Sequence, residues 1–184
     1  MIQFTNGTNE QVTIKCKDGV QMLKMSWFMG DTEDLTDAHV IRKAVFIDEQ
    51  GVSLEEEIDG TDGACIHLVL YEKYDKDDEN EKNENGKPVA TGRIMVTNED
   101  FIIGRVATLK DYRGMGLGKA VMQTLINACI MMGAERVTLG AQIQAVKFYE
   151  KLGFVAYGDI YDDAGIPHIH MERIGGSSCC SEVS

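Results

Sequence analysis

The chain has 184 residues, of which 18 are basic and 30 acidic, giving a net charge of −12 and a pI near 4.7. Binding to nucleic acid or to an anionic membrane requires clustered Lys and Arg, so this balance argues against both partners. The hydrophobic content of 43% is typical of globular proteins, and a chain of this length buries roughly 70% of its unfolded surface, so one folded domain is expected.

Residues 1–21 form an N-terminal extension in which a weak alternation around an Asn-Gly pair suggests a hairpin. The first residues lack the basic and apolar segments of a signal peptide, and no apolar stretch reaches the roughly 18 residues that span a bilayer. The five cysteines show no metal-type spacing. Reduced thiols and a cytoplasmic location are therefore expected.

Strand and helix patterns alternate over residues 22–174, which we expect to form the domain. β-rich runs predict strands at 22–29, 64–72, 88–97, 101–109, 136–141, 154–157 and 168–173. Apolar residues spaced by three and four predict helices at 34–48, 117–132 and 143–152. The acidic segment 74–87 predicts a flexible loop, with a substrate-attracting loop as the alternative, and 175–184 a polar tail. These elements predict a mixed α/β sheet with helices on its faces.

A glycine-rich turn, from Tyr112 to Lys119, stands between the strand at 101–109 and the longest helix. Its glycines let the backbone approach a ligand, and the helix start offers unpaired N–H groups, so the turn is suited to phosphate. A P-loop would need glycine at Arg113 and Ser or Thr at Ala120, and the dinucleotide fingerprint also fails. Taken alone, the turn could be an ordinary helix start.

The pattern Arg113-x-x-Gly116-x-Gly118 between a strand and a long helix resembles the acetyl-CoA pyrophosphate signature of the GCN5-related N-acetyltransferase (GNAT) family. Residues 142–154, QIQAVKFYEKLGF, resemble the second landmark of that family, a short helix and the turn after it. The resemblance covers roughly residues 22–173. It implies a GNAT-like α/β fold, with a mixed, mostly antiparallel sheet, helices on both faces and a splayed central strand pair.

A narrower resemblance points to the ElaA/YjcF-like bacterial branch of this family. It rests on residues 41–52, IRKAVFIDEQGV, on Glu57 and Asp59, and on residues 165–168, GIPH.

The resemblance implies acetyl-CoA as the co-substrate. The backbone at the end of the strand at 101–109 would pair with the pantetheine arm, and the glycine-rich turn would wrap the pyrophosphate. The expected cofactor-binding residues are Val106, Ala107, Thr108, Arg113, Gly114, Met115, Gly116, Leu117, Gly118, Lys119 and Gln142. No metal site is expected, because His168 and His170 lack a third ligand.

Acetyl transfer to an amine requires a neutral nucleophile, stabilisation of an oxyanion and a proton for the departing thiolate. A lysine-like amine is neutral about once in 10^3.4 at pH 7, so its deprotonation costs roughly 4.6 kcal/mol. Tyr149 is the expected acid, with a half-buried packing residue as the alternative. The resemblance also implies backbone N–H groups of residues 107–109 as oxyanion donors.

The base is not identified by the sequence. The candidates are Glu49, Glu57, Asp59 and His67. We expect Glu49 and His67 as catalytic residues, although His67 alternates with apolar neighbours and could equally be an interior histidine. Residues 55–57, EEE, could be a solvated acidic run or a border of the acceptor site.

The sequence thus predicts an acetyl-CoA-dependent N-acetyltransferase that transfers the acetyl group directly to a primary amine of a small molecule. One alternative is a non-catalytic acetyl-CoA-binding sensor. Another is an acyltransferase that takes a longer acyl chain, or a protein N-terminus as acceptor. The expected partner is the small-molecule amine, with neither nucleic acid nor a membrane, and a homodimer remains an open alternative.

Overall fold

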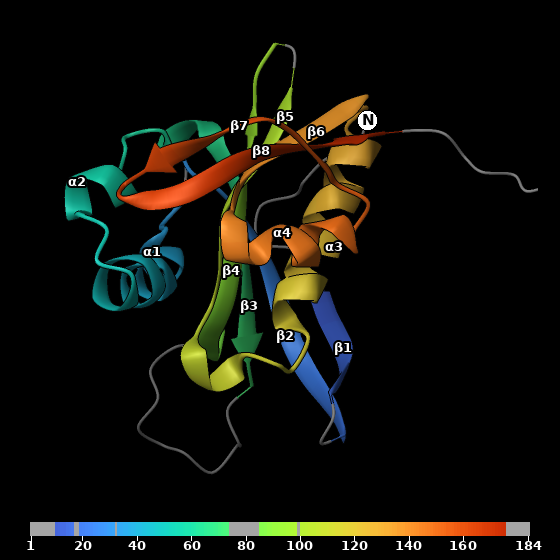
Figure 1. Ribbon diagram of the computed structural model, residues 1–184. Helices are drawn as coiled ribbons and strands as arrows, with labels where there is room; N and C mark the ends of the chain where they lie inside the picture. Colours follow the sequence, from blue (N-terminus) through green and yellow to red (C-terminus); the bar gives the residue numbers. More distant parts are fainter. Residues whose placement is uncertain (1–9, 17–18, 32, 74–84, 99, 176–184) are drawn as a thin grey trace, which may run out of the picture.

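The computed structural model describes residues 10–16, 19–31, 33–73, 85–98 and 100–175. Within this part, eight strands form one sheet in the order β1-β2-β3-β4-β5-β6-β8-β7 (Figure 1). The β5–β6 pair is parallel and the other neighbours are antiparallel. The predicted mixed, mostly antiparallel α/β sheet is confirmed.

The strands are β1 (Glu10–Cys16), β2 (Gly19–Met29), β3 (Cys65–Glu72), β4 (Lys87–Val96), β5 (Phe101–Thr108), β6 (Arg136–Gln142), β7 (Val155–Asp163) and β8 (Ile166–Ile174). The α-helices are α1 (Thr36–Arg42), α2 (Leu54–Glu57), α3 (Leu117–Met131) and α4 (Val146–Glu150). A π-helix, η1 (Lys43–Glu49), continues α1. Short 3₁₀ turns are η2 (Asp62–Ala64), η3 (Lys110–Tyr112) and η4 (Ile143–Ala145).

Several elements differ from the sequence prediction. The helix expected over 143–152 is a 3₁₀ turn, η4, followed by α4, which has only five residues. The helix expected over 34–48 changes from α to π at Lys43. Helix α2 was not predicted, and it begins with a capping box between Ser53 and Glu56. Strand β7 runs on to Asp163, past an irregularity near Gly158, which has φ +72°.

The N-terminal residues add an edge strand, because β1 pairs with β2 from Glu10↔Met25 to Cys16↔Gly19. The Asn-Gly pair of the expected hairpin lies outside the described residues. So do residues 74–84 of the acidic segment and residues 176–184 of the tail.

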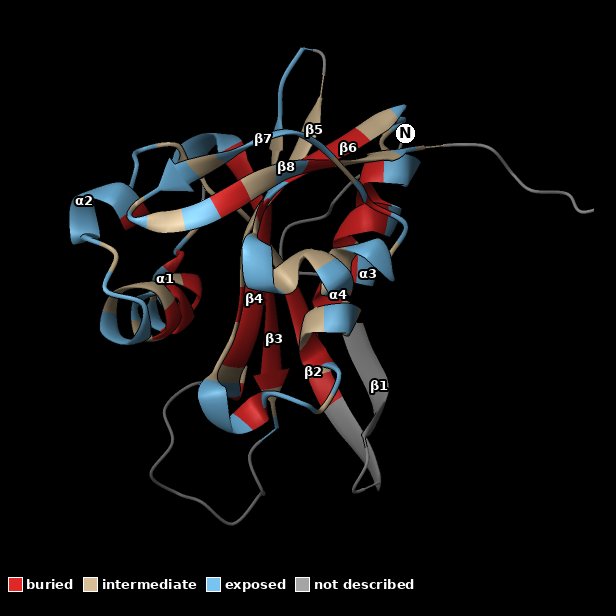
Figure 2. Ribbon diagram, in the orientation of Figure 1, coloured by how far each residue is buried: buried red, intermediate tan, exposed pale blue. Residues whose placement is uncertain are grey.

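Two apolar clusters hold the helices to opposite faces of the sheet (Figure 2). The predicted stripe of α3, including Val121, Leu125 and Ala128, packs on one face with Leu68 of β3. On the other face, α1 packs on Val69, the next residue of β3. Successive strand residues point to opposite faces, so β3 contributes to both clusters.

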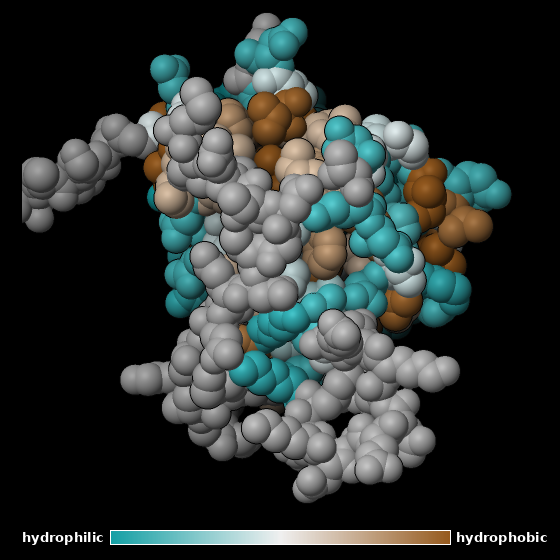
Figure 3. Space-filling view, turned by 180° about the vertical axis from the view of Figure 1, so that it is seen from behind, coloured by the Kyte–Doolittle hydropathy of each residue, from teal (hydrophilic) through white to brown (hydrophobic). Residues whose placement is uncertain are grey.

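Exposed large apolar residues occur on several separate elements of the described chain, among them α2, α3 and β7. The face turned away in Figure 1 is mostly hydrophilic where it is described, with hydrophobic residues in small separate patches (Figure 3). None of the helices in the described part is both long and apolar enough to cross a membrane.

Candidate active site

Strands β5 and β6 separate soon after they meet. They pair only at Phe101↔Val137 and Ile102↔Thr138, whereas β5 stays paired with β4 up to Thr108. Beyond the last β5–β6 pair lies a cavity of about 570 Å³. The splayed central strand pair expected from the sequence is therefore present, and it opens the cavity.

A bulge in β5 lies at the wall of this cavity. The register shifts between Thr91↔Ala107 and Arg93↔Gly104, so β5 has one residue more than β4 here, and Arg105 takes a φ of +52°. A side chain at Gly92 of β4 would crowd α3, because its Cβ would lie 2.7 Å from the Leu125 side chain. The bulge bends β5 where it borders the cavity.

Past the bulge, one backbone edge of β5 faces away from β4. The Leu109 N–H donates to the Val89 carbonyl at 3.0 Å, so this group is already bonded. Because successive N–H groups of a strand point to opposite edges, the Thr108 N–H points to the open side, and that of Ala107 toward β4. The Thr108 carbonyl also faces away from β4 and accepts from Arg113 Nε at 3.1 Å. Of the three N–H groups expected as oxyanion donors, only that of Thr108 is oriented toward the cavity.

The glycine-rich turn leads into the N-terminus of α3. Gly114 and Gly116 have φ of +78° and +88°, a conformation that favours glycine. Gly116 is the N-cap, and no side chain caps the helix. Gly118 lines the cavity, and a Cβ there would lie 3.6 Å from Thr108 Oγ1. The turn therefore presents unpaired helix N–H groups to the cavity, as an anion-binding site does.

Arg113 is part of this turn, and its guanidinium group hydrogen bonds to the Thr108 carbonyl and to Glu49. Its Nη2 donates to both carboxylate oxygens of Glu49, at 2.8 and 3.0 Å. Arg113 lines the cavity, whereas Glu49 does not. Glu49, an expected catalytic residue, thus lies next to the glycine-rich turn at the rim.

Tyr149 of α4 lines the cavity with its ring packed edge-on against Phe148 and Phe154. In the described part of the chain, no group hydrogen bonds to its hydroxyl. Burial raises the pKa of Tyr149 to about 12. A hydroxyl with this pKa stays protonated at neutral pH and can serve as a proton donor.

His67 lies away from the cavity, with only 1% of its surface exposed. Its Nε2 is 3.0 Å from the Asp62 carbonyl, and burial lowers the pKa of the imidazole. These contacts belong to an interior histidine. His67 is therefore not placed to take a proton from a substrate in the cavity.

A buried ion cluster supports the wall formed by α2, β4 and β5. Its guanidinium groups and carboxylates belong to Arg42, Arg93, Arg105, Glu57, Asp59 and Asp62. Burial raises the pKa of Asp62, but hydrogen bonds and charge from Arg42 and Arg93 outweigh it and hold this pKa well below the usual range. Arg93 acts in the same way on Asp59. Both carboxylates stay ionised and paired, so they are poor bases.

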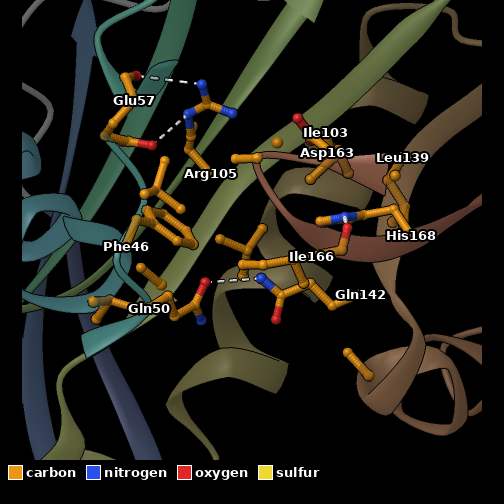
Figure 4. A pocket seen from close by; sticks show the side chains of 18 of the residues that line it. Phe46, Gln50, Glu57, Ile103, Arg105, Leu139, Gln142, Asp163, Ile166 and His168 are labelled. Atoms are coloured by element: carbon orange, nitrogen blue, oxygen red, sulfur yellow. Dashed lines mark hydrogen bonds and ion pairs between the residues drawn. The ribbon is translucent and has the colours of Figure 1, made fainter. Parts of the chain in front are cut away.

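The opposite wall is a row of side chains across three strands. Gln142 of β6 is opposite His168 of β8, which is opposite Tyr161 of β7, and all three line the cavity. Gln142 Nε2 donates to Gln50 Oε1 at 2.8 Å, which connects this wall to the residue after η1 (Figure 4). The rings of His168 and Tyr161 are stacked, with centroids 5.8 Å apart.

Residues 68–174 match the family described as "Acetyltransferase (GNAT) domain". YjcF of Bacillus subtilis (strain 168), an uncharacterized N-acetyltransferase, is 36% identical over 142 residues, which cover 77% of this chain and 93% of YjcF. The chain belongs to the GNAT acetyltransferase family.

Solved structures of GNAT relatives agree with this assignment. Escherichia coli ElaA has a TM-score of 0.69 at 28% identity, with 83% of this chain and 99% of ElaA covered. An acyl-CoA N-acyltransferase from Pseudomonas aeruginosa has a TM-score of 0.68 at 26% identity, with 82% and 99% covered. The predicted family and enzyme class are confirmed: this GNAT protein is an N-acetyltransferase that uses an acyl-CoA donor.

The residues of the cavity fit such a donor. The open edge of β5 can pair with the amides of a pantetheine arm, and the turn from Arg113 to Lys119 can hold the pyrophosphate. Lys119 has no ion-pair partner among the described residues, so its charge is available to an anion.

Sequence reasoning about this GNAT site missed Tyr161 and the place of His168. The alternation of His168 and His170 put both on one strand face, but it was considered only for zinc. The signal for Tyr161 was weaker, because the predicted strand ended at residue 157. The ion pairing of the cluster arginines was also missed, since they come from α1, β4 and β5 and lie far apart in the sequence.

Proposed function

We propose that this enzyme transfers an acetyl group from acetyl-CoA directly to a primary amine of a small molecule, with both substrates bound together. The observation that carries the proposal is that one continuous cavity between β5 and β6 reaches from the N-terminus of α3 to the Tyr149 side chain. A donor whose phosphates bind at α3 would place its thioester along β5, within reach of that hydroxyl.

The residues divide into three roles. Arg113, Lys119 and the α3 N–H groups hold the pyrophosphate. The Thr108 N–H stabilises the oxygen of the reacting carbonyl. Tyr149 donates its proton to the departing thiolate. A thiolate is a better leaving group than an alkoxide, because thiols have a pKa near 8.5, so it depends less on protonation.

An amine acceptor is supported by the charge of the cavity wall. Glu56 and Asp163 line the cavity, and in the described chain Asp163 has no hydrogen-bond or ion-pair partner for its carboxylate. The arginines that share this wall are already paired with carboxylates. The acceptor end is therefore acidic in balance and attracts a cationic amine. The cytoplasmic location stays a prediction from the sequence.

The donor site is tested by two matched aspartate variants at the ends of α3. Gly116→Asp places a carboxylate where the phosphate binds. Gly133→Asp is the control, since Gly133 has a similar φ of +93° and, like Gly116, no heavy atom within 4 Å of an added Cβ. Acetyl-CoA should raise the Tm of the wild type and of Gly133→Asp, and not that of Gly116→Asp. An equal shift in both variants contradicts the proposed donor site.

The acceptor is tested by a screen of polyamines, amino sugars and peptides with acetyl-CoA, in which release of free thiol is measured. Turnover with a small primary amine supports the proposal. Binding of acetyl-CoA without turnover of any amine indicates a sensor, and preference for a longer acyl-CoA or a peptide N-terminus indicates the other alternative.

A further inference from the structure

The position and bonding of His168 single it out among the titratable side chains of the cavity. It faces Gln142 in the β6–β8 ladder, and residues opposite each other in a ladder project to the same face. Its ring extends into the cavity (Figure 4). The side chain is only 9% exposed, so the strands hold it in place.

The hydrogen-bond partner of one ring nitrogen determines which nitrogen of His168 carries the proton. Nδ1 lies 2.8 Å from the Ile166 carbonyl, and a carbonyl can only accept a hydrogen bond. Nδ1 therefore carries a proton, and in the neutral imidazole Nε2 has a free lone pair. Among the described residues, no group hydrogen bonds to Nε2. This atom is also not among the fully buried polar atoms, so it is open to the cavity.

Two neighbours fix the ring and its surroundings. Tyr161 stacks on His168, and the Tyr161 hydroxyl packs so closely on Gly140 that a Cβ there would collide with it. Asp163, at the end of the same strand, also lines the cavity with an unpaired carboxylate. Asp163 is two residues along β7 from Tyr161, so its side chain projects to the same face of the sheet as those of Tyr161 and His168.

We infer that His168 is the general base of this enzyme and takes a proton from the acceptor ammonium group through Nε2, with Asp163 attracting that group. This inference rests on the proposed function. It supplies the base that the sequence could not identify, and it assigns a role to the Ile166 carbonyl, which fixes the required tautomer.

The protons balance as follows. His168 Nε2 accepts one proton from the ammonium and later gives it to solvent. The neutral amine then forms the C–N bond as the C–S bond breaks. Tyr149 gives its proton to the thiolate sulfur and regains one from the nitrogen as the amide forms. The products are the amide, the free thiol and one proton in solution.

The test compares the pH dependence of kcat/KM in the wild type, His168→Gln and His170→Gln. His170 is the control, because it lies on the same face of β8 and does not line the cavity. The titratable or charged groups that line the cavity with His168 are Tyr149, Tyr161, Asp163, Glu56, Glu57, Arg93, Arg105 and Arg113, and His170 stacks on Tyr161 with ring centroids 4.5 Å apart. Burial raises the pKa of both tyrosines, so both stay mainly protonated in an assay up to pH 9.5.

With n-butylamine or 1,4-diaminobutane as acceptor, the wild type and His170→Gln should reach a plateau in kcat/KM well below the pKa of the acceptor amine, because the base then takes the proton. His168→Gln should be slower by about 10²-fold at pH 7, a typical loss for a missing base. Its kcat/KM should keep rising to pH 9.5, because solution then supplies the neutral amine. The acetyl-CoA Kd should not change. A plateau at the same pH in His168→Gln, or an unchanged rate at pH 7, overturns the inference.

A measurement without turnover separates this inference from the proposed function. ¹⁵N-detected imidazole spectra of the ligand-free protein, with His168 assigned by the His168→Gln variant, should show the Nδ1–H tautomer above pH 7. An Nε2–H tautomer overturns the inference even if the enzyme acetylates amines. Failure of the wild type to acetylate any amine would instead overturn the proposed function, whatever the tautomer.

Discussion

Glu57→Gln tests whether the acidic run at 55–57 contributes to the fold or only to the surface charge. Glu57 is 2% exposed and forms ion pairs with Arg42 and with Arg105, the latter at 2.9 Å. Glu55, two residues earlier in the same helix, is exposed. Glutamine keeps the shape of glutamate, but its amide group would point N–H donors at one of the two guanidinium groups.

The expected loss can be estimated from burial. Removing one partner of a buried pair typically costs about 3–5 kcal/mol. The Arg105 side chain is 24% exposed, so water can solvate its charge once the partner carboxylate is lost. We therefore take the lower end of this range, about 3 kcal/mol. For a chain of this size, each kcal/mol lowers Tm by roughly 2–4 °C, so Glu57→Gln should lower Tm by about 6–12 °C.

Thermal and urea unfolding of Glu57→Gln and Glu55→Gln measure this difference directly. Glu55→Gln should change the free energy of unfolding by less than about 0.5 kcal/mol, as exposed substitutions usually do. Equal Tm values for the two variants would refute the argument, because they would show that Glu57 is solvated like its neighbour.

Three further changes test other parts of the structure. Tyr149→Phe should lower turnover by about 10²-fold or more while the Kd of acetyl-CoA stays within about twofold, and equal turnover would remove Tyr149 from the mechanism. Asp62→Asn should make stability less sensitive to acid. The depressed pKa of Asp62 stabilises the fold above the unfolded-state pKa of about 3.9, and this stabilisation is lost as pH falls below that value; identical pH profiles of the urea midpoint would contradict the argument. Gly92→Ala should lower the free energy of unfolding by about 1–3 kcal/mol, because its Cβ would lie 2.7 Å from Leu125, and an unchanged urea midpoint would show that α3 can shift.

The elements that the sequence predicts well are those with a strong local pattern. The α3 stripe ends at a glycine, and its apolar spacing leaves only one face that can pack, so both its limits and its orientation could be predicted. The change from α to π at Lys43 could not, because the apolar spacing of residues 34–48 fits an ordinary helix. The cluster of Arg42, Arg93 and Arg105 could not be predicted either, since its members come from three separate elements.

The two interior histidines show why the base could not be chosen from sequence. His67 and His168 both lie on strands beside apolar residues, and both hydrogen bond to a backbone carbonyl. The difference lies in what faces each ring. His67 is enclosed among the residues of the ion cluster, whereas His168 lies beyond the point where β5 and β6 separate. Strand separation depends on how distant segments meet, so local pattern carries no signal for it.

The distribution of charge explains how an acidic protein can bind an anionic donor. The buried cluster contains three guanidinium groups and three carboxylates, so it adds no net charge at the cavity. At the glycine-rich turn, Arg113 forms an ion pair with Glu49, and this pair is partly exposed, with side chains 44% and 33% accessible. An exposed pair of this kind is held by only about 0–1 kcal/mol. Glu49 can therefore release Arg113 to a pyrophosphate at little cost, and the helix terminus and Lys119 add attraction within a few ångströms. The net charge of −12 acts over longer distances, where physiological salt screens it beyond about 8 Å.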